Sequence, residues 1–140
     1  MAVPVWALLG FAAWTVAVLL FPVGIYRWSR ILTGRASIRS FRADVVEGED
    51  WYKRAMRAHA NCIENLPVFA AIVLILHIAE ITSATVDALA GMILGARIVQ
   101  SLIHLSFVQT NTVVSVRFTF FLAQIVGFLW LIAIIVVEGR

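Results

Sequence analysis

The sequence predicts an all-α integral membrane protein, a bundle of four transmembrane helices within a single domain over residues 1–140. The composition is 62% hydrophobic and 14% charged, against about 45–50% and about 25% in soluble domains. Charge-free apolar runs lie near both ends of the chain, and most basic residues fall between the first two spans. Helices are expected rather than open strands, because strand edges would leave backbone groups unpaired in lipid.

The first span is predicted over residues 3–27. Residues 1–26 contain no Asp, Glu, Lys or Arg, and about 20 apolar residues are enough to cross the hydrocarbon core. Pro22 and Gly24 near the end of this run predict a kink, because proline removes a backbone donor from the helix.

Two weaker spans are predicted over residues 51–79 and 82–108, and the last over residues 112–137. The last span contains a charge-free run over residues 118–137. The two middle spans carry polar groups, among them Arg97. Ionisable residues within a membrane normally face a bundle interior or a wet cavity, so the middle helices are expected to line a polar site.

The orientation follows from the distribution of Lys and Arg. Residues 27–57 hold eight of the eleven basic residues, whereas residues 80–87 carry Glu80 and Asp87 and no basic residue. Because basic loops stay in the cytoplasm, the first loop is predicted to be cytoplasmic and both termini external. For a bacterial host the location would be the inner or plasma membrane. The same pattern indicates topology rather than a nucleic-acid partner.

Polar residues on the second span fall on one helical face. Arg57, Asn61 and Glu64 are spaced i, i+4 and i+7, a spacing that places side chains above one another. Arg54 extends this face by a turn. The whole polar face would lie in the cytoplasmic half of the bundle.

The third and fourth spans bring further polar residues to the same half. Arg97 and His104 are seven residues apart, with Gln100 or Ser101 between them on the same face. Arg117 lies at the predicted cytoplasmic start of the fourth span. The orientation, deduced from charge alone, therefore makes the polar groups of three helices converge.

Four arginines, one carboxylate, an amide pair and a histidine favour a ligand with carboxylates and an amine. Arginine binds carboxylates through two parallel hydrogen bonds, and Glu64 would accept an ammonium group. Glutathione, with two carboxylates, one amine and a thiol, has this chemistry. A purely structural alternative is that Glu64 and Arg97 neutralise each other between helices, because burying either charge alone is costly.

Three stretches resemble the MAPEG superfamily, the membrane-associated proteins in eicosanoid and glutathione metabolism. They read RAHANCIENLPVF over 57–69, ARIVQSLIHL over 96–105 and VRFTFFLAQ over 116–124. The resemblance covers most of the chain and is closest in motif to microsomal glutathione transferase-like members.

The resemblance implies a homotrimer that binds glutathione between subunits in the cytosolic half and conjugates it to a lipophilic molecule arriving from the bilayer, or reduces a lipid hydroperoxide. It implies no metal. Arg117 would stabilise the glutathione thiolate, since a cationic neighbour favours the ionised thiol. Either Arg27 or Arg30 would also reach the ligand. The predicted glutathione contacts are Arg54, Arg57, His59, Asn61, Glu64, Arg97 and His104.

Departures from the family pattern leave the activity open. Gln100 and His104 stand where related enzymes often carry tyrosines, and residues 118–121 read FTFF where a tyrosine is expected. A non-catalytic ligand-binding or scaffolding member is therefore the main alternative. A small four-helix exporter is less favoured, because the first span has no ionisable coupling residue. Another low-molecular-weight thiol would replace glutathione in a host that lacks it.

Three further expectations concern residues outside this site. Cys62 is expected to pack in the interior. His77 is expected to lie at the outer membrane interface without polar neighbours. The arginines of residues 27–42 are expected to hold anionic lipid as well.

Overall fold

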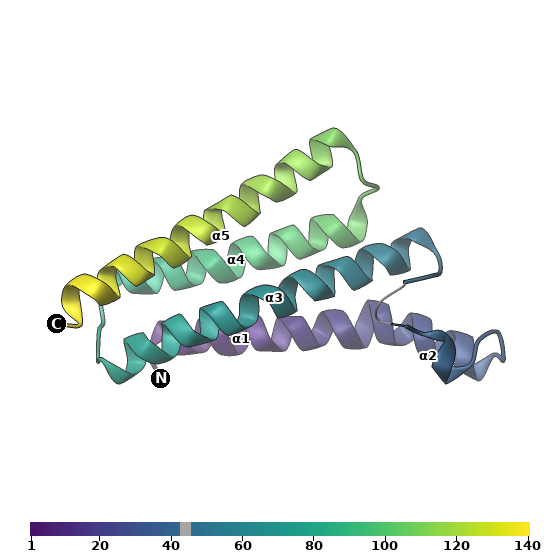
Figure 1. Ribbon diagram of the computed structural model, residues 1–140, viewed down its shortest axis with the longest axis horizontal. Helices are drawn as coiled ribbons and strands as arrows, with labels where there is room; N and C mark the ends of the chain where they lie inside the picture. Colours follow the sequence, from purple (N-terminus) through teal and green to yellow (C-terminus); the bar gives the residue numbers. More distant parts are fainter. Residues whose placement is uncertain (43–45) are drawn as a thin grey trace.

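The computed structural model describes residues 1–42 and 46–140. Within these residues every regular element is helical, and four helices are long and apolar enough to cross a membrane (Figure 1). This confirms the predicted all-α architecture with four spans. In chain order the elements are α1 (Val3–Val18), the π-helical segment η1 (Leu19–Gly24), α2 (Ile25–Leu32), the 3₁₀ turn η2 (Ile38–Ser40), α3 (Asp50–Ile78), α4 (Ala84–Ser106) and α5 (Asn111–Glu138).

The first span is longer than predicted, because it continues through η1 into α2 and ends at Leu32. Pro22 lies inside η1, where a wider helical turn accommodates the missing backbone donor without ending the helix. Packing against α3 then keeps the more polar α2 helical. The Tyr26 ring stacks on Tyr52 with ring centres 4.1 Å apart, and Arg27 Nε donates to the Tyr52 hydroxyl at 2.9 Å.

Side-chain caps explain where the last two spans begin. Ser83 accepts a hydrogen bond from the backbone N–H of Val86 at 3.2 Å, so α4 starts at Ala84 rather than at residue 82. Thr110 caps α5 in the same way by accepting from Val113 at 3.2 Å. Such caps satisfy amide donors that have no partner within the helix.

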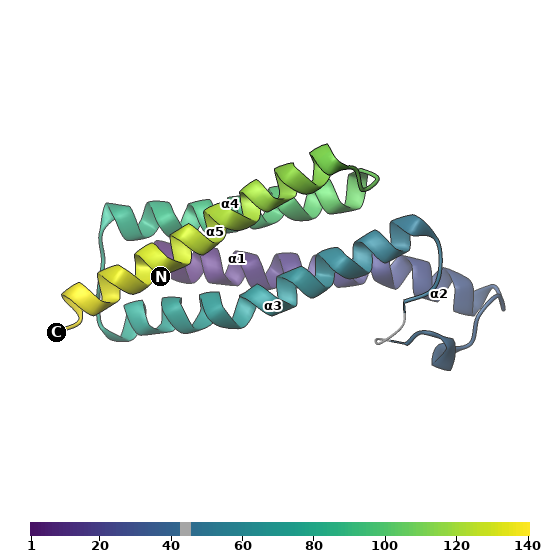
Figure 2. The same cartoon turned by 45° about the horizontal axis from the view of Figure 1, so that its top comes forward.

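The core lies where α1, α3 and α4 pack together, and α5 lies mainly against α4 (Figures 1 and 2). Phe11 of α1, Phe69 of α3 and Ile93 of α4 are fully buried, and α5 adds Phe128 and Leu131. Many large apolar side chains face outward instead, as expected of helices surrounded by lipid. Examples are Trp6, Leu20, Leu74, Leu129 and Trp130.

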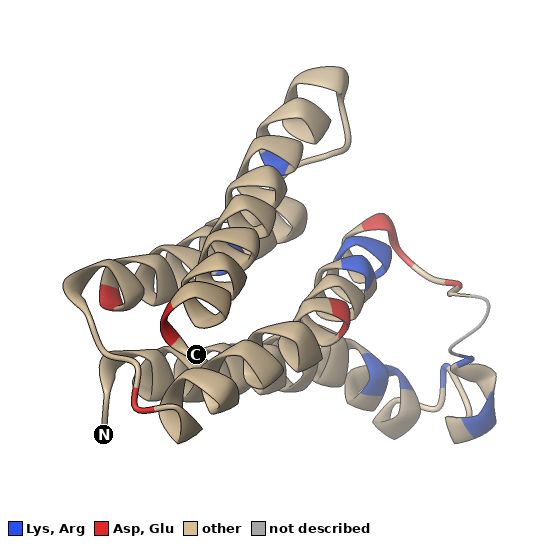
Figure 3. Cartoon of the chain, turned by 60° about the vertical axis from the view of Figure 1, so that its left-hand side comes forward, with Lys and Arg blue, Asp and Glu red and all other residues tan. Residues whose placement is uncertain are grey.

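The two ends of the bundle differ in charge (Figure 3). We use the term basic end for the end that carries α2, η2, the start of α3 and the α4–α5 connection. The terminal end carries both chain termini and the α3–α4 connection. Most Lys and Arg residues lie at the basic end.

Gly127 sets the distance between α5 and α4. A Cβ atom at this position would lie 2.9 Å from Ile93 Cγ1 and 2.9 Å from Met92 Cε. We expect Gly127→Ala to lower the free energy of unfolding by about 1–3 kcal/mol, the usual cost of overpacking a core. Gly91→Ala is the matched control, because nothing lies within 4 Å of a Cβ at Gly91 on α4. Thermal unfolding of both variants in detergent measures the difference, and equal midpoints would contradict the account.

Candidate functional site

A cavity of about 580 Å³ opens at the basic end between α3, α4, α5 and the α4–α5 connection. Small-molecule sites usually enclose about 300–1000 Å³. The polar side chains on α3 share one face because their spacing of i, i+4 and i+7 matches the helical repeat. The lining residues are Arg57, Ala60, Asn61 and Glu64 from α3, His104 from α4, Gln109 from the connection and Arg117 from α5.

Gln109 orients the guanidinium of Arg57. Arg57 Nη1 donates to Gln109 Oε1 at 2.9 Å, across a sequence separation of 52 residues. The sequence analysis did not single out Gln109, although this residue follows the predicted end of the third span at residue 108, on the same side as the arginines. That placement, together with the amide side chain at the first position of the connection, was the signal in the sequence that could have indicated Gln109.

His104 joins α4 to both neighbouring helices. Arg117 Nη1 lies 2.6 Å from Nε2 and 2.7 Å from Nδ1 of His104, and Asn61 Nδ2 lies 3.2 Å from Nε2. Only an unprotonated ring nitrogen accepts such a bond. The imidazole therefore holds the Arg117 guanidinium at the cavity wall.

Glu64 brings an available carboxylate to the cavity. Its side chain is exposed and forms no hydrogen bond or ion pair with any residue that the structure describes. In particular, it forms no ion pair with Arg97 among these residues, and the two opposite charges attract each other only at longer range.

Arg97 does not line this cavity and lies deeper in the bundle. It is only 1% exposed, with its guanidinium carbon 5.7 Å from the centre of the Phe11 ring. Its Nε and Nη2 have no hydrogen-bond partner within residues 1–42 and 46–140. Arg97, one of the residues that the sequence analysis predicted to contact glutathione, is therefore a cation in the interior of the bundle.

Gln100 and Ser101, one turn beyond Arg97, also face the interior rather than the cavity. Gln124 Nε2 donates to Gln100 Oε1 at 2.9 Å, which links α5 to α4. Ser101 donates to the Arg97 carbonyl at 2.8 Å and lies 3.5 Å from Cys62 Sγ. Cys62 is fully buried, in agreement with the packing role expected for it.

The remaining predicted contacts lie beside the cavity. His59 is partly buried on α3 and is absent from the lining. Arg54 lines a smaller cavity of about 170 Å³, which it shares with Arg57 and Gln109. The structure thus places neither His59 nor Arg54 in the larger cavity, although Arg54 stays beside Arg57.

The two candidate arginines at the end of the first span are engaged by side chains of the same chain. Arg27 contacts Tyr52 and also lies 3.6 Å from Met56 Sδ. Arg30 Nη2 pairs with Glu49 Oε1 at 3.0 Å. Neither lines the cavity that contains Arg117.

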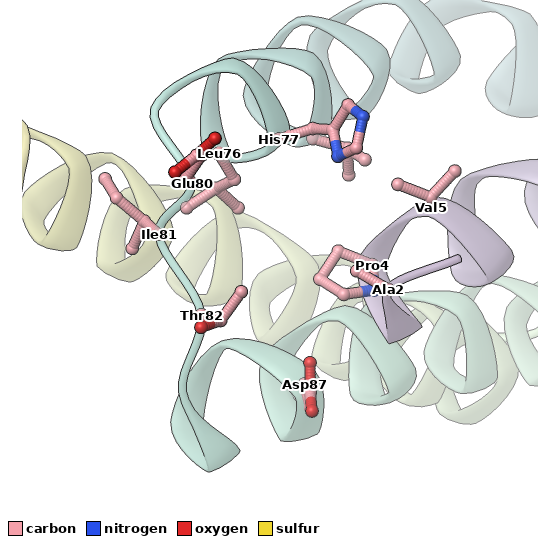
Figure 4. Close-up of a pocket in the computed structure, with 10 residues that line it drawn as sticks. Ala2, Pro4, Val5, Leu76, His77, Glu80, Ile81, Thr82 and Asp87 are labelled. Carbon is pink, nitrogen blue, oxygen red and sulfur yellow. The ribbon is translucent and has the colours of Figure 1, made fainter.

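A second cavity, of about 360 Å³, lies at the terminal end between α1, α3 and α4 (Figure 4). His77, Glu80 and Asp87 line it, together with Thr82. His77 thus shares a cavity with polar residues, although its side chain forms no hydrogen bond or ion pair with a described residue. The chain turns back after Ile78 in the α3–α4 connection. This turn brings Glu80 and Asp87, which lie 3 and 10 residues after His77 in the sequence, to the same cavity.

Comparison with protein families supplies a match over nearly the whole chain. The model of the MAPEG family matches residues 3–137, which include every residue that lines the cavity at the basic end and all four spans except Glu138. No curated protein and no solved structure matches.

Proposed function

This chain belongs to the MAPEG family, whose members include glutathione-using transferases and related proteins, and we propose that it binds glutathione in the cavity at the basic end. The observation that carries the proposal is the set of side chains converging there: two arginines, two amides and one carboxylate that has no partner among the described residues. These groups complement the carboxylates and the amine of glutathione. The orientation proposed from charge places this end in the cytosol, where the thiol would enter.

Each end of glutathione has a distinct partner in this proposal. Arg57, held by Gln109, binds a glutathione carboxylate through its guanidinium fork. Glu64 accepts the ammonium group. Asn61 lies beside His104 and offers an amide to the peptide backbone of the ligand.

Arg117 acts on the glutathione sulfur. A fixed positive charge favours the thiolate over the thiol, and the thiolate is the nucleophile. Arginine stays protonated, so it stabilises the thiolate without quenching it. The bond to His104 limits the motion of Arg117, and such preorganisation reduces the reorganisation needed when charge develops.

The reaction we propose joins the glutathione sulfur to an electrophilic carbon of a lipophilic molecule. The thiolate supplies the electron pair for the new C–S bond, and the leaving group departs with the pair of the broken bond. α5 offers the route from the bilayer, because Val114 and Phe118 beside Arg117 are exposed on its surface. A lipid hydroperoxide would react differently: the thiolate attacks its terminal oxygen, the O–O bond breaks to release the lipid alcohol, and a second glutathione converts the resulting sulfenic acid to the disulfide and water.

A non-catalytic binding role is the second candidate, favoured by the lining of the cavity. Among the described residues that line it, none carries a hydroxyl group. Gln100, which stands where relatives often have tyrosine, is bonded to Gln124 instead. Glutathione-dependent turnover of an electrophile would exclude this candidate.

We also propose that the protein assembles as a homotrimer with the cavity closed by a neighbouring copy. Arg57 and Glu64 are both exposed in the single chain, whereas charged ligand contacts within a membrane normally lie in protected sites. Mass measurement of the detergent-purified protein with and without glutathione tests the assembly.

The proposed binding mode predicts a moderate role for Gln109. Removing its amide in Gln109→Ala releases Arg57, at a cost of about 0.5–1.5 kcal/mol for one hydrogen bond. We therefore expect glutathione affinity to fall several-fold in a calorimetric titration. Asn111→Ala, which changes an exposed amide two residues further on, should bind as the wild type does. A Gln109→Ala variant with unchanged affinity would remove Gln109 from the site.

A further inference from the structure

A second binding site follows from the segment that leads out of the first span at the basic end. We propose that residues 25–42, here called the arginine hook, bind the phosphate headgroup of an anionic phospholipid. This proposal concerns a different surface from the glutathione cavity and does not depend on the function proposed for that cavity.

An apolar stripe begins at Phe21, just before the hook, and continues the lipid-facing surface of the first span along α2. Phe21, Ile25, Trp28 and Leu32 follow a helical repeat of i, i+4, i+7 and i+11, and their side chains are 63%, 60%, 57% and 79% exposed. The opposite face of α2 is buried, because Tyr26 stacks on α3. An apolar stripe of this length favours contact with the bilayer, so the hook lies at the depth of the headgroups.

The charge of the hook complements an anionic headgroup. Residues 25–42 contain five arginines and no acidic residue. Two of the arginines are already engaged: Arg27 by Tyr52 and Arg30 by Glu49. Arg35 and Arg39 are exposed and form no hydrogen bond or ion pair with a described residue. Their charge is therefore free to attract a phosphate.

A cavity of about 440 Å³ lies on the inner side of the hook. Arg30 and Arg35 line it, and so do Ser37 and Ser40, although the Ser40 hydroxyl already donates to the Ser37 carbonyl at 2.6 Å. Arginine forks and hydroxyl groups are the donors that phosphate oxygens accept from. Glu47 also lines the cavity, where Arg30 and Arg35 outnumber it; because Arg30 already pairs with Glu49, Arg35 is the cation left for a phosphate.

The position of these charges identifies a lipid rather than a soluble phosphate as the ligand. Clusters of arginines immediately beside a transmembrane helix bind anionic lipid, with each arginine contributing about fivefold in affinity. The apolar stripe beside the cavity would contact the acyl chains of the same lipid, which a soluble phosphate lacks.

Native mass spectrometry of the detergent-purified full chain tests the proposal, with phosphatidylglycerol, phosphatidylcholine and inorganic phosphate as probes. We expect phosphatidylglycerol to bind at least about tenfold more tightly than phosphatidylcholine. Arg35→Gln and Arg39→Gln should each weaken phosphatidylglycerol binding about fivefold and leave phosphatidylcholine binding unchanged. Arg35→Lys keeps the charge and should retain most of the affinity.

Arg140→Gln is the matched control, because it removes one exposed arginine at the opposite end of the bundle. It should bind phosphatidylglycerol as the wild type does. Equal affinity of the wild type for the two lipids, or an equal loss in Arg140→Gln, would overturn the proposal. Displacement of bound lipid by an equimolar concentration of inorganic phosphate would assign the cavity to a soluble ligand and overturn it as well. Thermal unfolding of each variant confirms that a loss of binding reflects the hook and not the fold.

Discussion

Replacing Arg117 by leucine is expected to lower kcat/KM for glutathione conjugation by about 100- to 1000-fold. A loss of this size is typical when a hydrogen-bond donor that stabilises negative charge in an active site is removed. The physical reason is that the cavity loses the Arg117 guanidinium, the cation that His104 holds in place. Without it the bound sulfur remains a thiol, which is a poor nucleophile. Steady-state rates with an aryl halide electrophile measure the effect.

Two variants separate this chemical role from a general loss of charge. Arg117→Lys keeps a cation but loses the fork and should recover part of the rate. Arg140→Leu removes an exposed arginine at the terminal end and should keep the wild-type rate. An Arg117→Leu protein that is correctly folded and fully active would show that another group ionises the thiol.

Glu64→Gln is expected to weaken glutathione binding by about 1.5–3 kcal/mol, the range for a hydrogen bond to a charged group. Every 1.4 kcal/mol corresponds to about tenfold in affinity. The substitution preserves the shape of the side chain and removes only its charge. Calorimetric titration with glutathione and with an analogue that lacks the amine measures the effect.

The analogue makes this prediction specific. If Glu64 binds the ammonium group, the analogue should bind wild type and Glu64→Gln equally, because the partner of the carboxylate is absent in both titrations. A similar loss for both ligands would mean that Glu64 shapes the cavity instead. Glu80→Gln, an exposed carboxylate at the terminal end, should leave both affinities unchanged.

The spans were predictable from the sequence because hydrocarbon tolerates little charge. The distribution of apolar and charged residues along the chain indicated four helices, and the structure has them. The end of the first span was not predictable. Arg27 reads as the start of a polar loop, but it bonds to Tyr52 on α3 and the helix continues. The local charge predicted that the first helix ends here, whereas packing against α3 lets the helix continue.

Helical spacing predicted part of the cavity and misplaced another part. Arg57, Asn61 and Glu64 share a face on α3 and line the cavity together. On α4 the same rule grouped Arg97 with His104, yet only His104 reaches the cavity. The difference is depth, since Arg97 lies two turns further into the bundle and packs beside Phe11. Periodicity gives a direction around the helix axis, but the position of neighbouring helices decides which turns of that face are open.

Contacts between distant segments were the least predictable part of the site. Gln109 bonds to Arg57 across 52 residues of sequence, and the Gln124 amide bonds to Gln100 across 24. Both pairs depend on how α3, α4 and α5 are packed. No pattern within one helix specifies such a partner, although the topology correctly brought the helix ends together.

The most direct test of the central claim is a titration of the detergent-purified protein with glutathione, read by the ultraviolet absorbance of the thiolate, for wild type and Arg117→Ala. We predict saturable binding with a thiolate signal in the wild type, and binding without that signal in Arg117→Ala. The absence of any binding to the wild type would contradict the account, because the cavity would then be a structural polar cluster. Binding without a thiolate signal in either protein would contradict the catalytic role of Arg117 and favour the non-catalytic alternative.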